Sequence, residues 1–252
     1  MKIIGITGKM GAGKDAVATA MGQADPSVRR IALADALKRT AMDLFDLSYD
    51  QVFGSQAQKA EMDPRWGKSP REILQTMGTD VARALHPDVW VRRMIRDMET
   101  WEHHHRAWVF DAANRRWEMA YFGLRTDSPQ EHPIWVVPDV RFPNEAAAIR
   151  KAGGVVLKVT RPFEFATWGK NSDGAPWRQC KLCHAYYPPL FSYPPPDSAA
   201  WHRDTCPHAH PSERGVDEIE PDYTFINEIE GLEHVQRQAE HYLNRAKAER
   251  GW

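Results

Sequence analysis

Residues 2–15, KIIGITGKMGAGKD, decide the fold. After Lys2, residues 3–7 are apolar or β-branched, and they lead directly into glycines, so residues 2–7 are predicted to form a short buried strand. Glycine recurs three times between positions 8 and 13, and a helical apolar pattern follows over residues 15–21. The stretch therefore predicts a strand, a glycine-rich turn and a helix, which is the beginning of an α/β domain.

The turn carries the pattern G-x-x-x-x-G-K, from Gly8 to Lys14. Between a strand and a helix, this pattern curls the backbone so that its N–H groups surround a β-phosphate. The positive end of the helix dipole acts on the same anion, and the lysine charge reaches the β- and γ-phosphates. A glycine-rich turn that binds nothing is the alternative. We expect ATP to be held by Gly8, Gly11, Ala12, Gly13, Lys14, Asp15 and Ala16.

Asp15 stands where this motif normally has Ser or Thr to hold Mg²⁺. A carboxylate beside a triphosphate is repelled unless a cation lies between them, and Mg²⁺ prefers oxygen ligands. We therefore expect Asp15 to bind Mg²⁺. The alternative is an acidic residue that only complements the helix dipole.

The bulk composition restricts the function classes. The chain has 252 residues, 42% of them hydrophobic, and a formal net charge of −1. Such a balance gives no global attraction to nucleic acid or to anionic membranes, so neither is an expected partner. No apolar run approaches the roughly 20 residues of a spanning helix, and no signal peptide is evident. We expect a cytoplasmic protein, in the host cytoplasm if it is phage-encoded, and a homodimer stays open.

Strand and helix patterns alternate along the rest of the chain, which predicts a parallel sheet with helices on both faces. Further strands are expected at 31–33, 134–138, 155–160 and 223–226. Further helices are expected at 35–45, 69–85, 88–104, 143–151 and 232–247. Residues 54–70 are predicted to be a loop, 107–122 a β-hairpin, and 161–221 an irregular segment.

Several patches resemble the phage-type deoxynucleoside monophosphate kinases. They are Gly13-Lys-Asp15, Leu33-Ala-Asp-Ala-Leu-Lys38, the run Arg71 to Arg83, Asp88-Val-Trp90, Asp139-Val-Arg-Phe-Pro-Asn-Glu145, His210-Pro-Ser-Glu213 and Asp222 to Asn227. The resemblance implies one P-loop kinase domain over 1–252, a three-layer sandwich of the nucleoside monophosphate kinase type. It also implies an acceptor-binding region at 33–87, an inserted hairpin at 106–132, and a lid with a Cys/His-rich insertion at 161–221.

Candidate catalytic residues follow the strands. Asp139 comes at the end of an apolar strand, where functional side chains of parallel sheets gather, and Arg141 lies two residues further on. We expect Asp139 to contact Mg²⁺-bound water or orient the acceptor, and Arg141 to bind the acceptor phosphate. An Asp–Arg pair that only fixes the turn is the alternative. With Lys14, the lid residue Arg161 completes the predicted catalytic set, and Arg178, Arg203 and Arg214 are further lid candidates.

The acceptor site is expected on the helix at 69–85. Arg71, Gln75, Thr79 and Arg83 are spaced three to four residues apart and would share one face, which suits a phosphate and a base edge. A solvated helix face is the alternative. The resemblance adds Lys38, Asn144 and Glu145 as substrate-binding residues.

Three cysteines lie close together, as C-x₂-C followed by C-x-H. Zn²⁺ takes four tetrahedral sulfur or nitrogen ligands, and two of them can come from one turn. We expect a structural zinc ion; three incidental thiols are the alternative, and a redox role has less support because no helix follows the C-x₂-C. The predicted ligands are Cys180, Cys183, Cys206 and His208, with His184, His202 and His210 as alternatives to His208.

Three functions remain open. The first is a kinase that transfers the γ-phosphoryl of ATP, with Mg²⁺, to a deoxynucleoside 5′-monophosphate. The second is a small-metabolite kinase similar to the dephospho-coenzyme A or phosphomevalonate kinases. The third is a nucleotide-gated zinc module that binds nucleic acid, which a salt-dependent titration would reveal.

Overall fold

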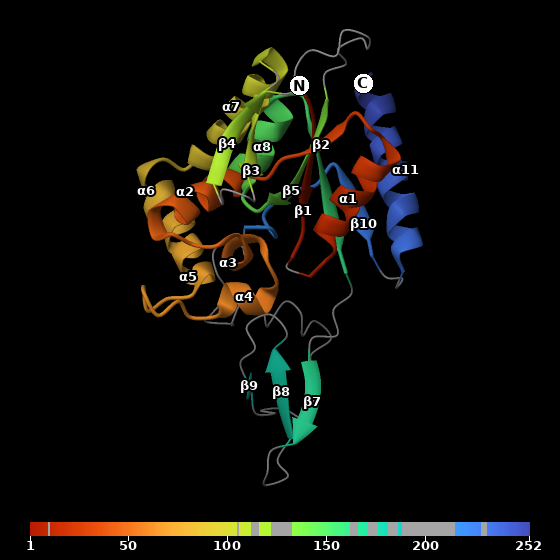
Figure 1. Cartoon of the computed structure of the whole chain (residues 1–252). Coiled ribbons are helices and arrows are strands. Elements are labelled where there is room, and N and C mark those ends of the chain that lie inside the picture. Colours follow the sequence, from red (N-terminus) through yellow and green to blue (C-terminus); the bar gives the residue numbers. More distant parts are fainter. Residues whose placement is uncertain are drawn as a thin grey trace.

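The computed structural model describes the chain except residues 10, 105, 112–115, 122–132, 162–165, 171–175, 181–185, 188–214 and 228–230. Its centre is a five-stranded sheet in the order β10-β6-β1-β5-β2, and every pairing in it is parallel (Figure 1). The strands are β1 (Lys2–Thr7), β2 (Val28–Arg30), β5 (Ile134–Val140), β6 (Val155–Thr160) and β10 (Tyr223–Ile226). The predicted parallel α/β sheet is confirmed, although β2 begins at Val28 rather than at residue 31.

Helices cover both faces of this sheet (Figure 1). Ile4 points to the face covered by the first and last helices, and Ile3 to the opposite face. This alternation follows from the pleat of the strand. At Gly5 a Cβ atom would come within 2.7 Å of Ile149, so the glycine lets a helix approach the centre of the sheet. These helices are α1 (Lys14–Ala24) and α11 (Leu232–Arg250) on one face, and α7 (Val89–His104) and α8 (Pro143–Lys151) on the other.

A third apolar cluster lies away from the sheet, among short helices. It contains Ala41, Leu47, Val52 and Ile73. The prediction of a loop over 54–70 is wrong at α4, because Ser55 and Gln58 form a capping box that begins a helix there. The helices that contribute to this cluster are α2 (Asp35–Phe45), α3 (Tyr49–Phe53) and α5 (Pro70–Gln75), and α4 (Gln56–Ala60) packs against α3 and α5.

The helix predicted over 69–85 is interrupted. It starts as expected, with a capping box between Ser69 and Glu72 and a proline in the first turn. Thr76–Val81 then forms a π-helix, η1, before α6 (Ala82–Leu85) resumes α geometry. The indole Nε1 of Trp90 donates to the carbonyl oxygen of Gly78 at 2.8 Å, inside the wide turn.

The predicted hairpin is confirmed. β3 (Arg106–Asp111) and β4 (Arg116–Tyr121) pair antiparallel. Trp117 anchors the hairpin on the α2–α3 cluster, since its Nε1 lies 3.3 Å from the sulfur of Met42 and its ring centroid 5.8 Å from that of Phe53.

The segment predicted to be irregular over 161–221 contains three strands, so that prediction is wrong there. They are β7 (Ala166–Lys170), β8 (Pro176–Cys180) and β9 (Tyr186–Tyr187), and they form an antiparallel sheet. Threonine, tryptophan and tyrosine favour strands, a signal that the many prolines obscured. In Figure 1 this small sheet lies beyond the carboxyl-terminal edge of the main sheet.

Two further findings concern the described part of the chain alone. None of its helices is long and apolar enough to cross a membrane. Its His, Cys, Asp and Glu side chains form no group of three or more that could hold a metal ion. Of the predicted zinc ligands, Cys180 ends β8, whereas Cys183, Cys206 and His208 lie outside the described residues, so the zinc site stays a prediction.

Candidate active site

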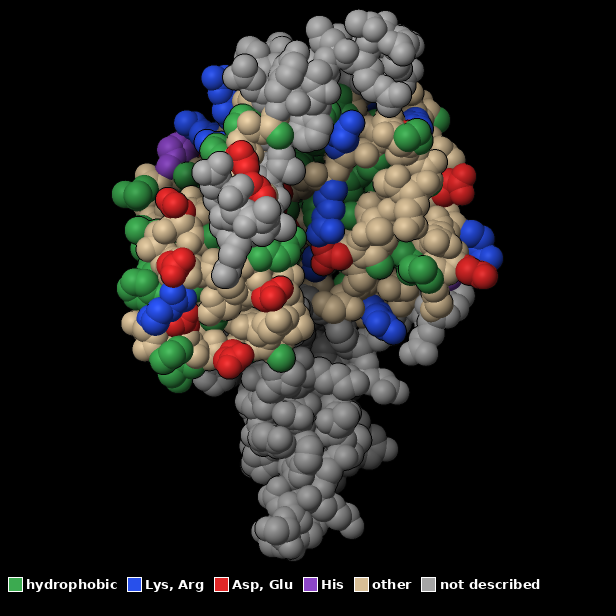
Figure 2. Space-filling view, viewed as in Figure 1, with side chains coloured by type: hydrophobic (Ala, Val, Ile, Leu, Met, Phe, Trp, Pro, Cys, Tyr) green, Lys and Arg blue, Asp and Glu red, His purple; other side chains and the backbone are tan. Residues whose placement is uncertain are grey.

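The candidate site lies where the parallel strands end. β1 runs into the glycine loop, Asp139 lies near the end of β5, and Arg161 and Asn227 directly follow β6 and β10. Because the sheet is parallel, these residues gather at one edge, where ligands bind in open α/β sheets. Figure 2 shows a furrow between the α2–α4 side and the α1 side of the molecule, with Lys and Arg side chains gathered along it.

The glycine loop has the geometry of a phosphate cradle. Gly8, Gly11 and Gly13 have φ angles of 148°, 80° and 98°, a region that other residues rarely adopt. Lys14 folds back over the loop, and its Nζ donates to the carbonyl oxygens of Gly8 at 2.7 Å and Lys9 at 2.8 Å. Positive-φ glycines with a lysine folded over them are typical of a phosphate-binding loop, and the binding of ATP by this loop stays a prediction.

A buried asparagine braces this loop. Asn227 is 8% exposed, and its Nδ2 donates to the carbonyl oxygen of Ala12 at 3.2 Å. Its backbone N–H donates to Thr160 at 2.7 Å, which fixes it to the end of β6. The sequence patterns assigned Asn227 no role of its own, although a polar residue directly after a buried strand was the available signal.

Two ion pairs connect the loop with other elements. Asp15, in the first turn of α1, pairs with Arg30 at the end of β2. Lys9 pairs with Asp217 at 2.6 Å, and Asp217 belongs to the segment that leads to β10. The carboxylate of Asp15 is a suitable oxygen ligand for Mg²⁺, and Arg30 balances its charge here.

Asp139 is bonded to the start of α2. Its Oδ1 accepts from the N–H of Leu33 at 2.9 Å and its Oδ2 from the N–H of Ala34 at 3.0 Å. The β1–β5 register shifts between Gly5 and Thr7, a bulge of the kind that re-aims side chains near active sites. Burial raises the pKa of the neighbouring Asp35, and the negative charge of Asp139 raises it further. Asp139 thus connects β5 to the start of the predicted acceptor-binding region.

Glu145 is buried and bonds to three neighbouring groups. It is 2% exposed, pairs with Arg83, and accepts from the backbone N–H groups of Arg141 at 2.8 Å and Phe142 at 3.1 Å. Burial raises the pKa of Glu145. The guanidinium of Arg83 also lies 4.0 Å from the centre of the Phe142 ring. The geometry therefore gives Glu145 and Arg83 a positioning role at the turn that carries Arg141.

The helix that carries the predicted common face is interrupted. Thr76–Val81 forms a π-helix, which has more residues per turn than an α-helix, so the positions from Arg71 to Arg83 do not follow one α-helical period. Asn144, also a predicted substrate ligand, donates to Asp88 at 2.8 Å and to the carbonyl of Pro87 at 3.2 Å. The face shared by the four residues from Arg71 to Arg83 stays a prediction.

The predicted acceptor-binding region carries the cations Lys38 and Arg71. The ammonium of Lys38, in α2, lies 4.6 Å from the centre of the Phe53 ring. Arg71 lies in the first turn of α5, which packs against α2 and α4. Gln75 is the last residue of α5, and Thr79 lies within η1. Lys38 and Arg71 are therefore on neighbouring elements, as the predicted acceptor site requires.

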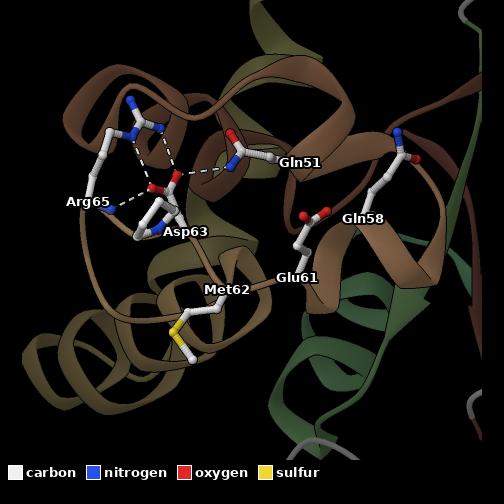
Figure 3. Close-up of a pocket in the computed structure, with 7 residues that line it drawn as sticks. Gln51, Gln58, Glu61, Met62, Asp63 and Arg65 are labelled. Carbon is white, nitrogen blue, oxygen red and sulfur yellow. Dashed lines mark hydrogen bonds and ion pairs between the residues drawn. The ribbon is translucent and has the colours of Figure 1, made fainter.

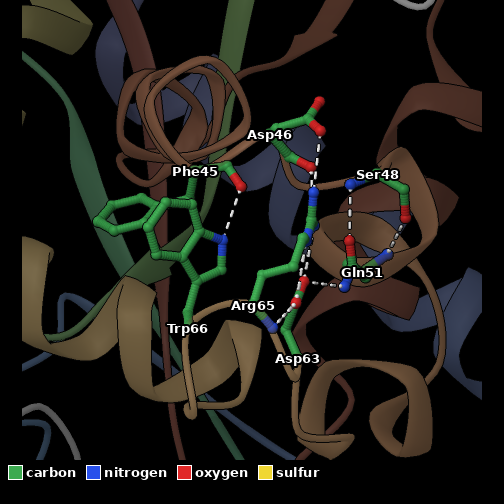
Figure 4. Close-up of polar contacts among 7 residues, drawn as sticks. All are labelled: Phe45, Asp46, Ser48, Gln51, Asp63, Arg65 and Trp66. Carbon is green, nitrogen blue, oxygen red and sulfur yellow. Dashed lines mark hydrogen bonds and ion pairs between the residues drawn. The ribbon is translucent and has the colours of Figure 1, made fainter.

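A pocket of about 370 Å³ lies beside this region, and Figure 3 shows the residues that line it. Arg65 and Gln51 hydrogen bond to Asp63 and hold the pKa of that carboxyl well below its usual range. Arg65 also bonds to Asp46, and the indole of Trp66 donates to the carbonyl of Phe45 at 2.9 Å (Figure 4). This network fixes residues 63–66 onto the end of α2 and gives the pocket a rigid wall.

Comparison with known proteins agrees with this geometry. No protein-family model matches the chain. Over 171 residues the chain is 33% identical to a protein of Acanthamoeba polyphaga mimivirus described as "Putative deoxynucleotide monophosphate kinase". The similarity covers 64% of this chain and 75% of that protein. The chain belongs to the deoxynucleotide monophosphate kinase family.

Proposed function

We propose that the chain transfers the γ-phosphoryl group of ATP to a deoxynucleoside 5′-monophosphate, giving the diphosphate and ADP. The similarity to the mimivirus protein supports nucleotide kinase activity. We add ATP as the phosphoryl donor, a deoxynucleoside monophosphate as the acceptor, and the residues that bind each of them. The observation that carries it is a glycine loop covered by Lys14 and followed by α1, in the same domain as two packed helices, α2 and α5, that carry the cations Lys38 and Arg71.

The donor residues act by position and charge. The loop from Gly8 to Gly13 presents N–H groups to the β-phosphate, and Lys14 neutralises charge on the β- and γ-phosphates. Asn227 braces the loop through its hydrogen bond to the carbonyl oxygen of Ala12. Mg²⁺, which Asp15 would help to hold, supplies a positive charge between the phosphates when bound. Residues 161–221 would form the lid, with Arg161 as its first arginine.

The acceptor residues orient the attacking phosphate. We assign Lys38, Arg71 and Arg141 to the acceptor 5′-phosphate, with Gln75 and Thr79 toward the nucleoside. Asp139 fixes the start of α2 and so sets the distance between donor and acceptor. In-line attack needs this alignment more than it needs a strong base, because the acceptor oxygen is already anionic.

The experiment is a coupled assay of ADP release against the four common deoxynucleoside monophosphates and their ribose counterparts. We expect at least one deoxynucleotide to be the best acceptor, while dephospho-coenzyme A and phosphomevalonate are inactive. Lys14→Ala should reduce turnover by about 100-fold or more, since one preorganised charge is removed from the transferring group. Activity on a small metabolite alone, or a Lys14→Ala variant with normal turnover, contradicts the proposal.

A further inference from the structure

Lys59, on α4, lies near two other positively charged side chains. Lys59 of this helix is only partly exposed, although lysine is usually solvated. α4 packs against α5, which carries Arg71, and α5 packs against α2, which carries Lys38. Burial lowers the pKa of Lys59, the positive charges of Lys38 and Arg71 lower it further, and the negative charge of Asp15 acts in the opposite direction. Lys59 of α4 thus lies within electrostatic reach of two further cations and one carboxylate, which are carried by three other helices.

The packing of α4 on α5 and of α5 on α2 keeps the backbones that carry these cations close together. A capping box at Ser55 and Gln58 fixes the start of α4, and a second capping box, at Ser69, fixes the start of α5. Lys38 is held over the ring of Phe53. Like charges that are held together destabilise a fold, and a bound anion relieves that cost. The arrangement therefore favours an anion beside these cations.

The position of this site points to the identity of the anion. Asp15 lies in the first turn of α1, directly after the glycine loop, so the charges that act on Lys59 come both from the donor side and from the acceptor helices. We propose that Lys59 is a ligand of the acceptor nucleotide's 5′-phosphate, acting together with Lys38 and Arg71. This inference rests on the proposed function and adds a residue that the sequence patterns did not indicate, because they predicted a loop at 54–70.

The test compares Lys59→Gln with Lys59→Arg. With saturating ATP, Lys59→Gln should raise the KM for the deoxynucleotide about tenfold or more, because a charge-assisted contact to phosphate is lost. The KM for ATP should change less than about twofold, since Lys14 and the glycine loop are intact. Lys59→Arg should keep most of the acceptor affinity. Lys151→Gln, at an exposed position on α8, is the matched control and should behave as the wild type.

A pH profile separates a ligand from a merely structural lysine. The pKa of Lys59 lies below the ordinary lysine value of 10.5, so the wild type should lose kcat/KM for the acceptor as pH rises toward that value. The charges that act on this titration are Lys38 on α2, Arg71 on α5 and Asp15 on α1. Lys59→Arg should move the alkaline loss to higher pH, since arginine stays charged.

The outcomes separate the two proposals. A wild type that phosphorylates a deoxynucleotide, together with a Lys59→Gln variant of normal acceptor KM, overturns the role of Lys59 alone. An unchanged alkaline limb in Lys59→Arg does the same. A wild type that neither phosphorylates nor binds any deoxynucleoside monophosphate, the binding being measured by calorimetry without ATP, overturns both.

Discussion

Gly8 has no room for a side chain. A Cβ atom there would overlap the carbonyl oxygen of Val159, and its φ angle of 148° is unfavourable for any other residue. Gly8→Ala should therefore lower the free energy of unfolding by about 2 kcal/mol or more and distort the phosphate cradle. Urea denaturation measures the loss.

Gly22 provides the control for this prediction. It lies in α1, and an added Cβ would meet nothing within 4 Å. Gly22→Ala should stabilise the protein by about 0.5–1 kcal/mol, because alanine loses less backbone entropy in a helix. Equal effects of the two substitutions would contradict the role given to the loop geometry.

Asp15 allows a test of the magnesium assignment. Asp15→Ser should retain activity and Asp15→Ala should lose most of it, because serine is the usual ligand at this position of the motif. The measurement is the Mg²⁺ concentration that gives half-maximal rate. Arg30→Gln is the control, since it removes the ion-pair partner of Asp15 and leaves the carboxylate in place. Serine and alanine variants with the same magnesium dependence would rule out the metal role.

At single positions, local motifs were predictable and long-range partners were not. Lys14 could be identified because its role depends on residues six positions away or fewer. Glu145 was predicted to bind substrate, yet its partner Arg83 is 62 residues away in sequence, and only the fold reveals the pair. Lys59 was missed for the same reason, since its neighbours come from three other helices.

At the scale of elements, α1 and α11 are joined by an ion pair between Asp25 and Lys247. Burial acts to raise the pKa of Asp25, but hydrogen bonds from Lys247 and Ser27 outweigh it and lower the value to about 2. A depressed carboxyl pKa stabilises the fold above the unfolded value of 3.8, and this contribution is lost as pH falls toward 2.

Asp25→Asn should therefore cost about 1 kcal/mol of unfolding free energy at pH 7, a figure reduced for solvent screening. The difference from the wild type should shrink between pH 4 and pH 2. Lys247→Met should lose a similar amount with the same dependence on pH. Thermal unfolding followed by circular dichroism across this range measures both, and a difference that is constant with pH would contradict the pairing.

Element types were predictable where the sequence period was strong. The strands at 134–140 and 155–160 are predominantly apolar, and both were predicted within two residues of their ends. The five-residue helices α3 and α4 are too short to show a period, and only their Ser-x-x-Gln capping boxes reveal them. The π-helix has no such local signal, and its contacts at Gly78 are with Leu37 and Trp90, which lie far from it in sequence.

For the whole molecule, the parallel α/β class followed from the alternation of strand and helix patterns. The separate apolar cluster on α2–α5 did not follow, because its members are contributed by five segments, one of them the inserted hairpin. Trp117 shows this dependence, since its ring packs on Phe53 and its indole meets Met42.

The zinc prediction also belongs to the whole molecule. We expect about one zinc ion per chain, held by three cysteine sulfurs and one histidine, as in structural zinc sites. Elemental analysis of freshly purified, reduced protein measures it. The triple variant Cys180→Ser, Cys183→Ser, Cys206→Ser should lose the metal and keep ATP binding at the glycine loop. Wild-type protein without zinc would contradict the prediction.

The π-helix has a consequence for anyone who aligns or redesigns this chain. A wide turn accommodates one residue more than an α-turn, so η1 behaves as a one-residue insertion absorbed inside a helix. Because the wide turn already absorbs the extra residue, deleting one residue between positions 76 and 81 should restore regular α geometry while α5 and α6 keep their relative orientation. A one-residue insertion that no wide turn absorbed would instead rotate the following helix by about 100°. An alignment of this chain should therefore allow a one-residue gap at η1, although the helical segment runs on without a loop there.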